Sequence, residues 1–190
     1  MMFVATCIVI ALLRRLGGVV LVLVVGTAAA AADHLPIDRF FGVYEGQSIS
    51  VTDYGLEKRD LGVTIRPERR GFNLSWTTVI HTESDEHSRK SYSIDFVPTA
   101  EPHVFASAMR RNLFGHRVPL DPMQGDPFVW ARIIDSTLSV YALIITPDGG
   151  YDLQTYDRTL IDDGLRLEFY RIRDGKVGTL VTGFLERVGE

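Results

Sequence analysis

The stretch FVWARIIDSTLSVYALIITPDGGYDLQTYDRTLIDDGLRLEFYRIRDGKVGTLVTGFLERV, residues 128–188, decides the fold predicted for this chain. It contains five segments rich in β-branched, aromatic and leucine residues, a composition typical of β-strands. Proline presets the φ angle of a turn and glycine accepts positive φ, so the short runs between the segments indicate chain reversals. These runs are Asp135-Ser136, Pro147-Asp148-Gly149-Gly150, Asp162-Asp163-Gly164 and Asp174-Gly175. The stretch therefore predicts five consecutive antiparallel strands, a β-meander.

The fourth of these segments has the clearest alternation in the chain. Its apolar and polar residues alternate with a period of two, which predicts one face toward a core and one toward water. The apolar set is Leu165, Leu167 and Phe169, and the intervening set is Arg166, Glu168 and Tyr170.

Further strands are predicted upstream, over residues 40–51, 61–65, 72–80 and 92–96. Residues 98–127 contain five prolines and little alternation, so we expect one long irregular loop. Its regular part is either a strand over residues 104–108 or a short helix between Glu101 and Asn112. Closing about nine or ten sequential strands removes both exposed sheet edges. We therefore expect an all-β fold, a single antiparallel up-and-down β-barrel.

The N-terminal 32 residues have the composition of a secretory signal peptide. Arg14-Arg15 precede an apolar run over residues 16–25, and small residues fill positions 26–32. This order predicts cleavage near Ala32, so that residues 33–190 form the β-barrel domain of a periplasmic or secreted protein with no membrane span. Residues 1–13 are also apolar, and they leave open the alternative of a retained anchor.

Charge and cysteine content exclude several classes of function. Removing the leader leaves 18 Lys and Arg against 24 Asp and Glu, a net charge of −6. This charge argues against nucleic acid or an anionic membrane surface as a partner. Cys7 is the only cysteine and lies in the leader, so the mature chain has no disulfide, thiolate metal site or cysteine nucleophile.

The opening Phe41-Gly42-Val43-Tyr44-Glu45-Gly46, with the meander that follows, resembles the calycin group of lipocalins and fatty-acid-binding proteins. Tyr44 stands where that group has the tryptophan of its Gly-x-Trp opening. The resemblance implies a lipocalin-like barrel with a ligand cavity, and a late-strand arginine such as Arg171 or Arg187. The run Gly125-Asp126-Pro127-Phe128-Val129-Trp130-Ala131-Arg132 also resembles exported proteobacterial proteins that have no assigned function.

One row of the 151–159 strand is a candidate ligand site. Tyr156 and Arg158 share a face with Asp152 and Gln154. If this face lines the barrel, the arginine and the phenol can hold a carboxylate or phosphate head group, as the arginine and tyrosine of the resembled fatty-acid-binding proteins do. The alternative, which the sequence favours, is that this row faces water and that the opposite row faces inward. That opposite row is Tyr151, Leu153 and Thr155.

Several aromatic residues lie on rows expected to face inward, and they either bound an apolar ligand or fill the barrel as core. They are Trp76, Trp130, Tyr92, Phe96 and Phe169.

Other polar clusters lack the spacing of a known site. The segment from His81 to His87 holds two histidines and three carboxylates, but its spacing matches no recurrent zinc pattern, so we predict no metal site. No nucleophile motif frames His103, His116, Ser107 and Asp121, so we predict no catalytic residue and no cofactor. Arg110, Arg111, His116 and Arg117 form a basic patch in the long loop, which we interpret as a solvated surface.

Three hypotheses about function follow. The leading one is an exported lipocalin-like barrel that binds a small apolar or amphipathic, lipid-like ligand in its interior. The alternative is a non-catalytic envelope module with a solidly packed barrel that binds another protein. A third is an enzyme of lipid modification, for which the Tyr156 and Arg158 row is the candidate site.

Overall fold

The computed structural model describes residues 34–52, 55–81, 87–107, 110–111, 117–118 and 121–190. The predicted signal peptide, residues 1–32, lies outside these ranges, so its cleavage stays a prediction. Two short 3-10 helices, η1 (Ile37–Phe40) and η2 (Pro122–Gln124), are present. No helix in the described ranges has the length and apolar character of a membrane-spanning helix.

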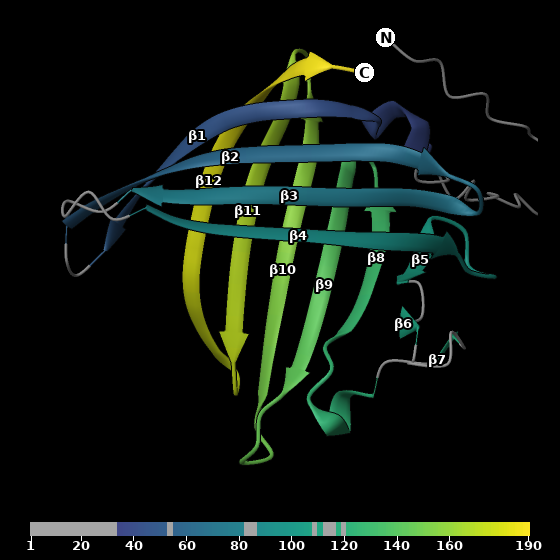
Figure 1. Ribbon diagram of the computed structural model, residues 1–190, viewed down its shortest axis with the longest axis vertical. Coiled ribbons are helices and arrows are strands. Elements are labelled where there is room, and N and C mark those ends of the chain that lie inside the picture. The colour runs from purple at the N-terminus through teal and green to yellow at the C-terminus, as the bar shows by residue number, and fades with distance from the viewer. Residues whose placement is uncertain (1–33, 53–54, 82–86, 108–109, 112–116, 119–120) are drawn as a thin grey trace, which may run out of the picture. The chain divides into compact units, whose positions relative to one another are not determined.

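Ten antiparallel strands close into a barrel in which every sequential pair of ring strands is hydrogen-bonded and the last strand pairs with the first (Figure 1). This confirms the predicted all-β up-and-down barrel and its five C-terminal strands. The ring strands are β1 (Gly42–Thr52), β2 (Gly55–Glu68), β3 (Gly71–His81), β4 (His87–Pro98), β5 (Val104–Ser107), β8 (Phe128–Ile134), β9 (Thr137–Ile145), β10 (Tyr151–Ile161), β11 (Gly164–Arg173) and β12 (Lys176–Gly189). A separate two-stranded ladder joins β6 (Arg110–Arg111) to β7 (Arg117–Val118).

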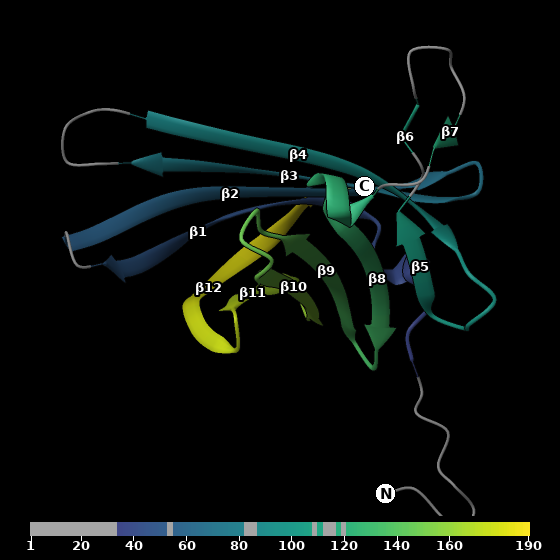
Figure 2. The ribbon, with the colours of Figure 1, turned by 90° about the horizontal axis from the view of Figure 1, so that it is seen from below.

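The barrel consists of two sheets that cross each other (Figures 1 and 2). One sheet is β1–β4, and the other is β8–β12 together with β5, which pairs with β8. They join at two short seams: β1 pairs with β12 over residues 43–47, and β4 pairs with β5 over residues 96–98. Among the described residues, positions 87–95 of β4 pair only with β3, and positions 176–183 of β12 pair only with β11. The ring is therefore closed at one end and open at the other.

The closed end is filled by apolar side chains from both sheets. Its fully buried members include Phe40, Phe72, Phe96, Leu138 and Leu165. Leu165 begins the alternating row predicted on β11, and Leu167 packs against this core. Fully burying such a side chain contributes about 1.5–3 kcal/mol, so this cluster dominates the stability of the barrel.

A cation–π contact fastens the first strand to the last at the closed end. The Arg187 guanidinium lies 5.0 Å from the centroid of the Tyr44 ring. Its Nη1 and Nη2 donate to the carbonyl oxygens of Phe41 and Arg39, at 2.7 and 3.1 Å. The Tyr44 hydroxyl donates to the Phe40 carbonyl at 2.9 Å. Of the two arginines that the resemblance indicated, Arg187 is therefore the one that contacts the opening strand.

Gly46 permits this closure because the two strands approach closely beside it. A Cβ atom at Gly46 would lie 2.0 Å from the carbonyl oxygen of Phe184, a distance that no side chain tolerates. A glycine within a strand is a recurrent sign of close backbone approach.

We expect Arg187→Met to lower the free energy of unfolding by about 2 kcal/mol, because it removes the cation–π contact and two charge-assisted hydrogen bonds. Urea denaturation followed by far-UV circular dichroism measures this loss. Arg66→Met is the matched control, because Arg66 is an exposed residue of β2. Equal stability of the two variants would contradict a structural role for Arg187.

Candidate ligand-binding site

A cavity of about 390 Å³ lies at the open end of the barrel, between β2–β4 and β10–β12. Trp76 and Tyr92 line it from one sheet, and Tyr156, Arg158 and Phe169 from the other. Its volume lies within the range of small-molecule sites. Its lining combines apolar and aromatic side chains with polar and charged ones in similar measure.

The even-numbered row of β10 faces this interior. Arg158 pairs across the sheet with Leu138 of β9 and Leu167 of β11, and both belong to the core or pack against it. Tyr151, on the opposite row, is 38% exposed. The expectation that Tyr151, Leu153 and Thr155 face inward is therefore wrong. The row of Arg158 faces inward instead, although it is the more polar row of β10, because it pairs with the inward-facing apolar rows of β9 and β11.

Arg158 is a buried cation at the inner limit of the cavity. Its exposed fraction is 2%, and Leu160, which follows it on the same row, packs against the core. Nη1 donates to the Tyr156 carbonyl at 3.2 Å, whereas Nε has no hydrogen-bond partner. No ion pair joins Arg158 to a carboxylate among the residues that the structure describes.

Burial lowers the pKa of Arg158 to about 10, and electrostatic interactions with Tyr156 and Asp157 counteract part of this shift. At neutral pH the guanidinium is still charged. Aromatic faces offset part of its lost hydration, since its Cζ atom lies 5.3 Å from the centroid of Trp76 and 5.9 Å from that of Tyr156. The side chain is thus a desolvated cation that forms no ion pair within the described part of the chain.

Four aromatic rings form a continuous series along the cavity. Trp76 lies 5.1 Å from Tyr92 and 5.5 Å from Tyr156, and Tyr156 lies 4.8 Å from Phe169, centroid to centroid. Tyr92 is 51% exposed and marks the entrance. Burial raises the pKa of Tyr156, whose hydroxyl donates to Gln154 Oε1 at 2.8 Å. The phenol is therefore a neutral hydrogen-bonding group at neutral pH.

An ion pair lies nearer the entrance, on the same inner row. Asp152 is 3% exposed and accepts from Nε of Arg171 at 3.1 and 3.0 Å through its two oxygens. Arg171 Nη2 also donates to Oδ2, and Arg173 lies 3.5 Å from that oxygen. The hydrogen bonds and charge of Arg171 hold the pKa of Asp152 below its usual range.

The structure places the six predicted ligand residues in three environments. Trp76, Tyr92, Tyr156 and Arg158 line the cavity. Phe96 faces inward, but it packs in the filled core, with its ring 5.1 Å from that of Phe72.

Trp130 does not face inward, so that prediction is wrong. Its neighbours Val129 and Ala131 are the buried residues of β8, and Trp130 stacks on Tyr141 of β9 at 4.9 Å on the outer surface. Aromatic character alone does not distinguish the inner row from the outer row of a strand. Buried small and β-branched residues at alternate positions were the signal that could have located the inner row.

The pairing of Arg171, which lines the cavity, with the buried Asp152 beside it is the feature that sequence reasoning missed. Arg171 entered the prediction only as a candidate for the late-strand arginine of the resembled calycin group. Asp152 lies near the start of one predicted strand and Arg171 near the end of the next. Opposite charges at the two ends of a predicted hairpin were a signal for cross-strand pairing.

Other predicted clusters contribute little to a site. Residues 82–86, His116 and the side chains of Arg110, Arg111 and Arg117 lie outside the part of the chain that is described. Asp121 caps η2, because its carboxylate accepts from the Met123 amide at 3.0 Å. No group of three or more potential metal ligands occurs among the described residues.

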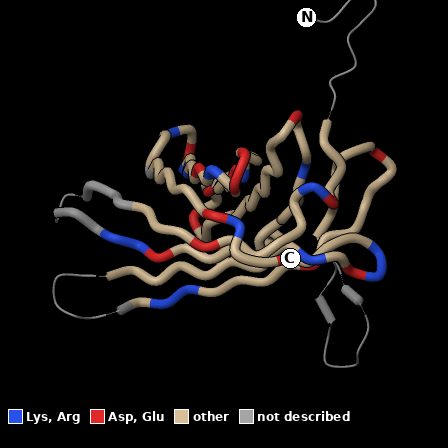
Figure 3. Tube along the Cα trace, turned by 90° about the horizontal axis from the view of Figure 1, so that it is seen from above, with Lys and Arg blue, Asp and Glu red and all other residues tan. Residues whose placement is uncertain are grey.

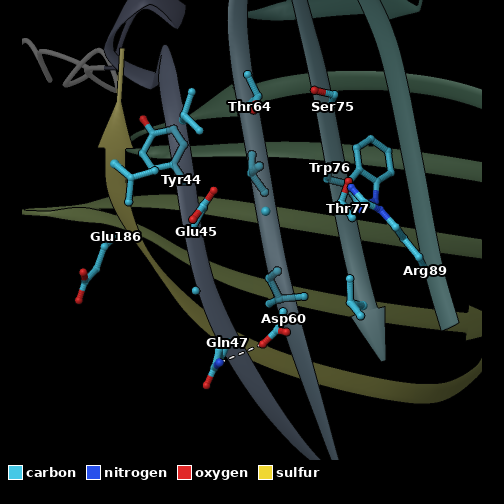
Figure 4. Close-up of a pocket in the computed structure, with 17 residues that line it drawn as sticks. Tyr44, Glu45, Gln47, Asp60, Thr64, Ser75, Trp76, Thr77, Arg89 and Glu186 are labelled. Carbon is cyan, nitrogen blue, oxygen red and sulfur yellow. Dashed lines mark hydrogen bonds between the residues drawn. The ribbon is translucent and has the colours of Figure 1, made fainter. Parts of the chain in front are cut away.

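A second concavity, of about 730 Å³, lies on the outer surface of β1–β3 (Figure 4). Its polar side chains include Gln47 and Asp60, which are joined by a hydrogen bond of 2.9 Å. Asp60 also contacts His81 Nε2 at 2.6 Å, and these contacts lower the pKa of Asp60. Because its surroundings already satisfy this carboxylate, the concavity is a weaker candidate than the inner cavity.

We expect Arg158→Met to raise the free energy of unfolding by about 1 kcal/mol or more, because replacing a buried unpaired charge with an apolar side chain removes its desolvation cost. Urea denaturation of this variant, beside the exposed Arg66→Met control, measures the change. A large loss of stability would instead show that the folded barrel itself supplies the partner of the guanidinium.

No protein-family model, curated protein or solved structure matches this chain. The closed antiparallel barrel is compatible with a calycin-like fold, and membership in that group stays a prediction.

Proposed function

We propose that this barrel binds a small amphipathic anion in its interior, with a carboxylate or similar group on Arg158. The observation that carries this proposal is the guanidinium, buried beside a cavity with an unpartnered Nε. An isolated buried cation is costly, and an anionic ligand would relieve that cost at the moment of binding. The aromatic series from Phe169 to Tyr92 would cover the apolar part of such a ligand.

The distribution of charge supports an anion rather than a neutral lipid. Arg59, Lys90, Arg158 and Arg171 line the cavity, and its only carboxylate is that of Asp157. The chain as a whole is acidic, so the positive charge of the cavity lining is opposite in sign to the net charge of the protein. Such a local positive charge attracts anions to a cavity within an acidic protein.

The two tryptophans allow a direct binding test. In a Trp130→Phe background, Trp76 is the only tryptophan left and reports from the cavity wall. We expect dodecanoate to change its fluorescence with saturable binding, and Arg158→Met to weaken that binding at least tenfold, because the head group loses its cation. Dodecanol, which has the same tail without charge, should be affected far less.

Arg66→Met is the control for nonspecific charge effects in this titration. Absence of saturable dodecanoate binding would reject the proposal. Equal loss of dodecanoate and dodecanol binding in Arg158→Met would reject the head-group role of the guanidinium.

Export of the chain is part of this proposal, on the basis of the composition of residues 1–32. We expect a full-length chain with a C-terminal tag, expressed in a Gram-negative bacterium, to yield a periplasmic species that begins at Asp33. Intact-mass spectrometry of the periplasmic fraction measures this. A full-length mass in the membrane fraction would favour the retained anchor.

The outer surface of β8–β12 favours a second function, the binding of another protein. In the β1–β4 sheet, charged residues are sparse along the middle of the strands (Figure 3). Hydroxyl and amide groups pair on the outer surface of that sheet, as Asn73 does with Ser93 and Thr77 with Ser91. The outer rows of β8–β12 hold many apolar and aromatic residues instead, beside the ion pair of Arg166 with Glu168 on β11. They include Phe128, Trp130, Tyr141, Leu143, Leu153, Tyr170, Ile172, Val177 and Leu180. Val177 is 76% exposed, and apolar surfaces of this kind often mark interfaces.

A further inference from the structure

Two of the four cationic side chains that line the cavity, Arg158 and Arg171, lie on its β10–β11 wall, and on that wall only Arg158 has no carboxylate partner among the described residues. Arg158 lies at the inner end without an ion pair, whereas Arg171 nearer the entrance is bound by Asp152. We infer that Asp152 is a specificity residue that restricts the cavity to ligands with one anionic end, bound at Arg158. This inference rests on the proposed function and names the class of ligand, a monoanionic amphiphile.

The spacing of the two arginines makes them separate subsites. Arg171 pairs across the sheet with Gln154, and Arg158 lies four residues further along β10. At about 3.4 Å per residue this separation is roughly 14 Å along the strand. The ring layer of Tyr156 and Phe169 lies between the two rows. One head group at Arg158 therefore does not also occupy Arg171, but a chain of ten to twelve carbons with a charge at each end would reach both.

The carboxylate of Asp152 is fixed in place at the outer subsite. It is 3% exposed, and its oxygens are held by Arg171 and approached by Arg173. A second anion arriving there would meet a satisfied ion pair and a buried negative charge rather than an available cation. Placing like charges against an unwanted ligand is a common means of selectivity.

Asp152 also has a structural effect, because it joins β10 to β11 at the open end. Its cross-strand partner in the ladder is Arg173, and its side chain bonds Arg171. A merely structural role would change stability, and would alter the affinities for all ligands in parallel. Selectivity between a monoanion and a dianion of equal length is therefore the measurement that separates the two roles.

The experiment compares dodecanoate with dodecanedioate in the Trp130→Phe background, by Trp76 fluorescence and isothermal titration calorimetry at pH 7.5. We expect dodecanoate to bind at least tenfold more tightly than dodecanedioate. Asp152→Asn should shift this ratio at least tenfold toward the dianion, because it frees Arg171 for the second carboxylate. Adding Arg171→Gln to Asp152→Asn should abolish the shift.

Asp95→Asn is the matched control, because Asp95 is an exposed residue of β4 whose carboxylate accepts from Asn73 on the outer surface. Far-UV circular dichroism and thermal melts test whether each variant folds. If Asp152→Asn does not fold, Arg171→Gln alone serves as the second measurement. It removes the cation and leaves the carboxylate, so the ratio should move further toward dodecanoate.

An unchanged ratio in Asp152→Asn, or an equal change in both affinities, would overturn the specificity role while the proposed function stands. A shift that persists in the double variant would also overturn it, since Arg171 would not be the group released. Failure of the Trp130→Phe protein to bind dodecanoate would instead overturn the proposed function, and this inference with it.

Discussion

The stacking of the Arg187 guanidinium on the Tyr44 ring fixes the seam between the first and last strands, and closure of the barrel around its apolar core depends on that seam. It joins the first strand to the last where their ladder covers only residues 43–47 of β1. The same arginine bonds the backbone that leads into β1, so one side chain fixes both the seam and the entry of the chain. Closure at this end leaves the two sheets free to diverge at the other. The cavity exists because the seams are short.

The inner row of β10 has a cost in stability that the proposed binding function would explain. Leu160 packs in the core, while Arg158 and Asp152 on the same row are both buried and charged. Asp152 has an arginine partner within the wall, so its burial is compensated. Arg158 contacts aromatic faces but forms no ion pair among the described residues, and the proposed anionic ligand would balance its charge. A barrel selected only for stability would have no reason to keep this arginine.

The two sheets of the barrel differ in the polarity of their outer surfaces. The β1–β4 sheet has a conventional alternation, with hydroxyl and amide ladders outside and Phe72 and Leu74 inside. The β8–β12 sheet is apolar on much of both surfaces, since Trp130 and Tyr141 stack on its outside. This double apolarity explains why the orientations of β10 and of Trp130 were predicted wrongly. Hydrophobic alternation identifies the inner row only where the outer row is polar.

Local patterns in the sequence determined the strands, the turns and the order of pairing, because turn chemistry and a period of two act between near neighbours. They also determined that Tyr156 and Arg158 share one face with Asp152, since alternation within a strand is fixed by the pleat. Only the tertiary structure decided which face is inside. That choice depends on register with β9 and β11, which brings Arg158 opposite Leu138 and Leu167. The tertiary structure also decided that Asp152 neutralises Arg171 and leaves Arg158 unpaired among the described residues. Such charge pairing depends on distances between side chains on different strands, which the sequence of one strand does not contain.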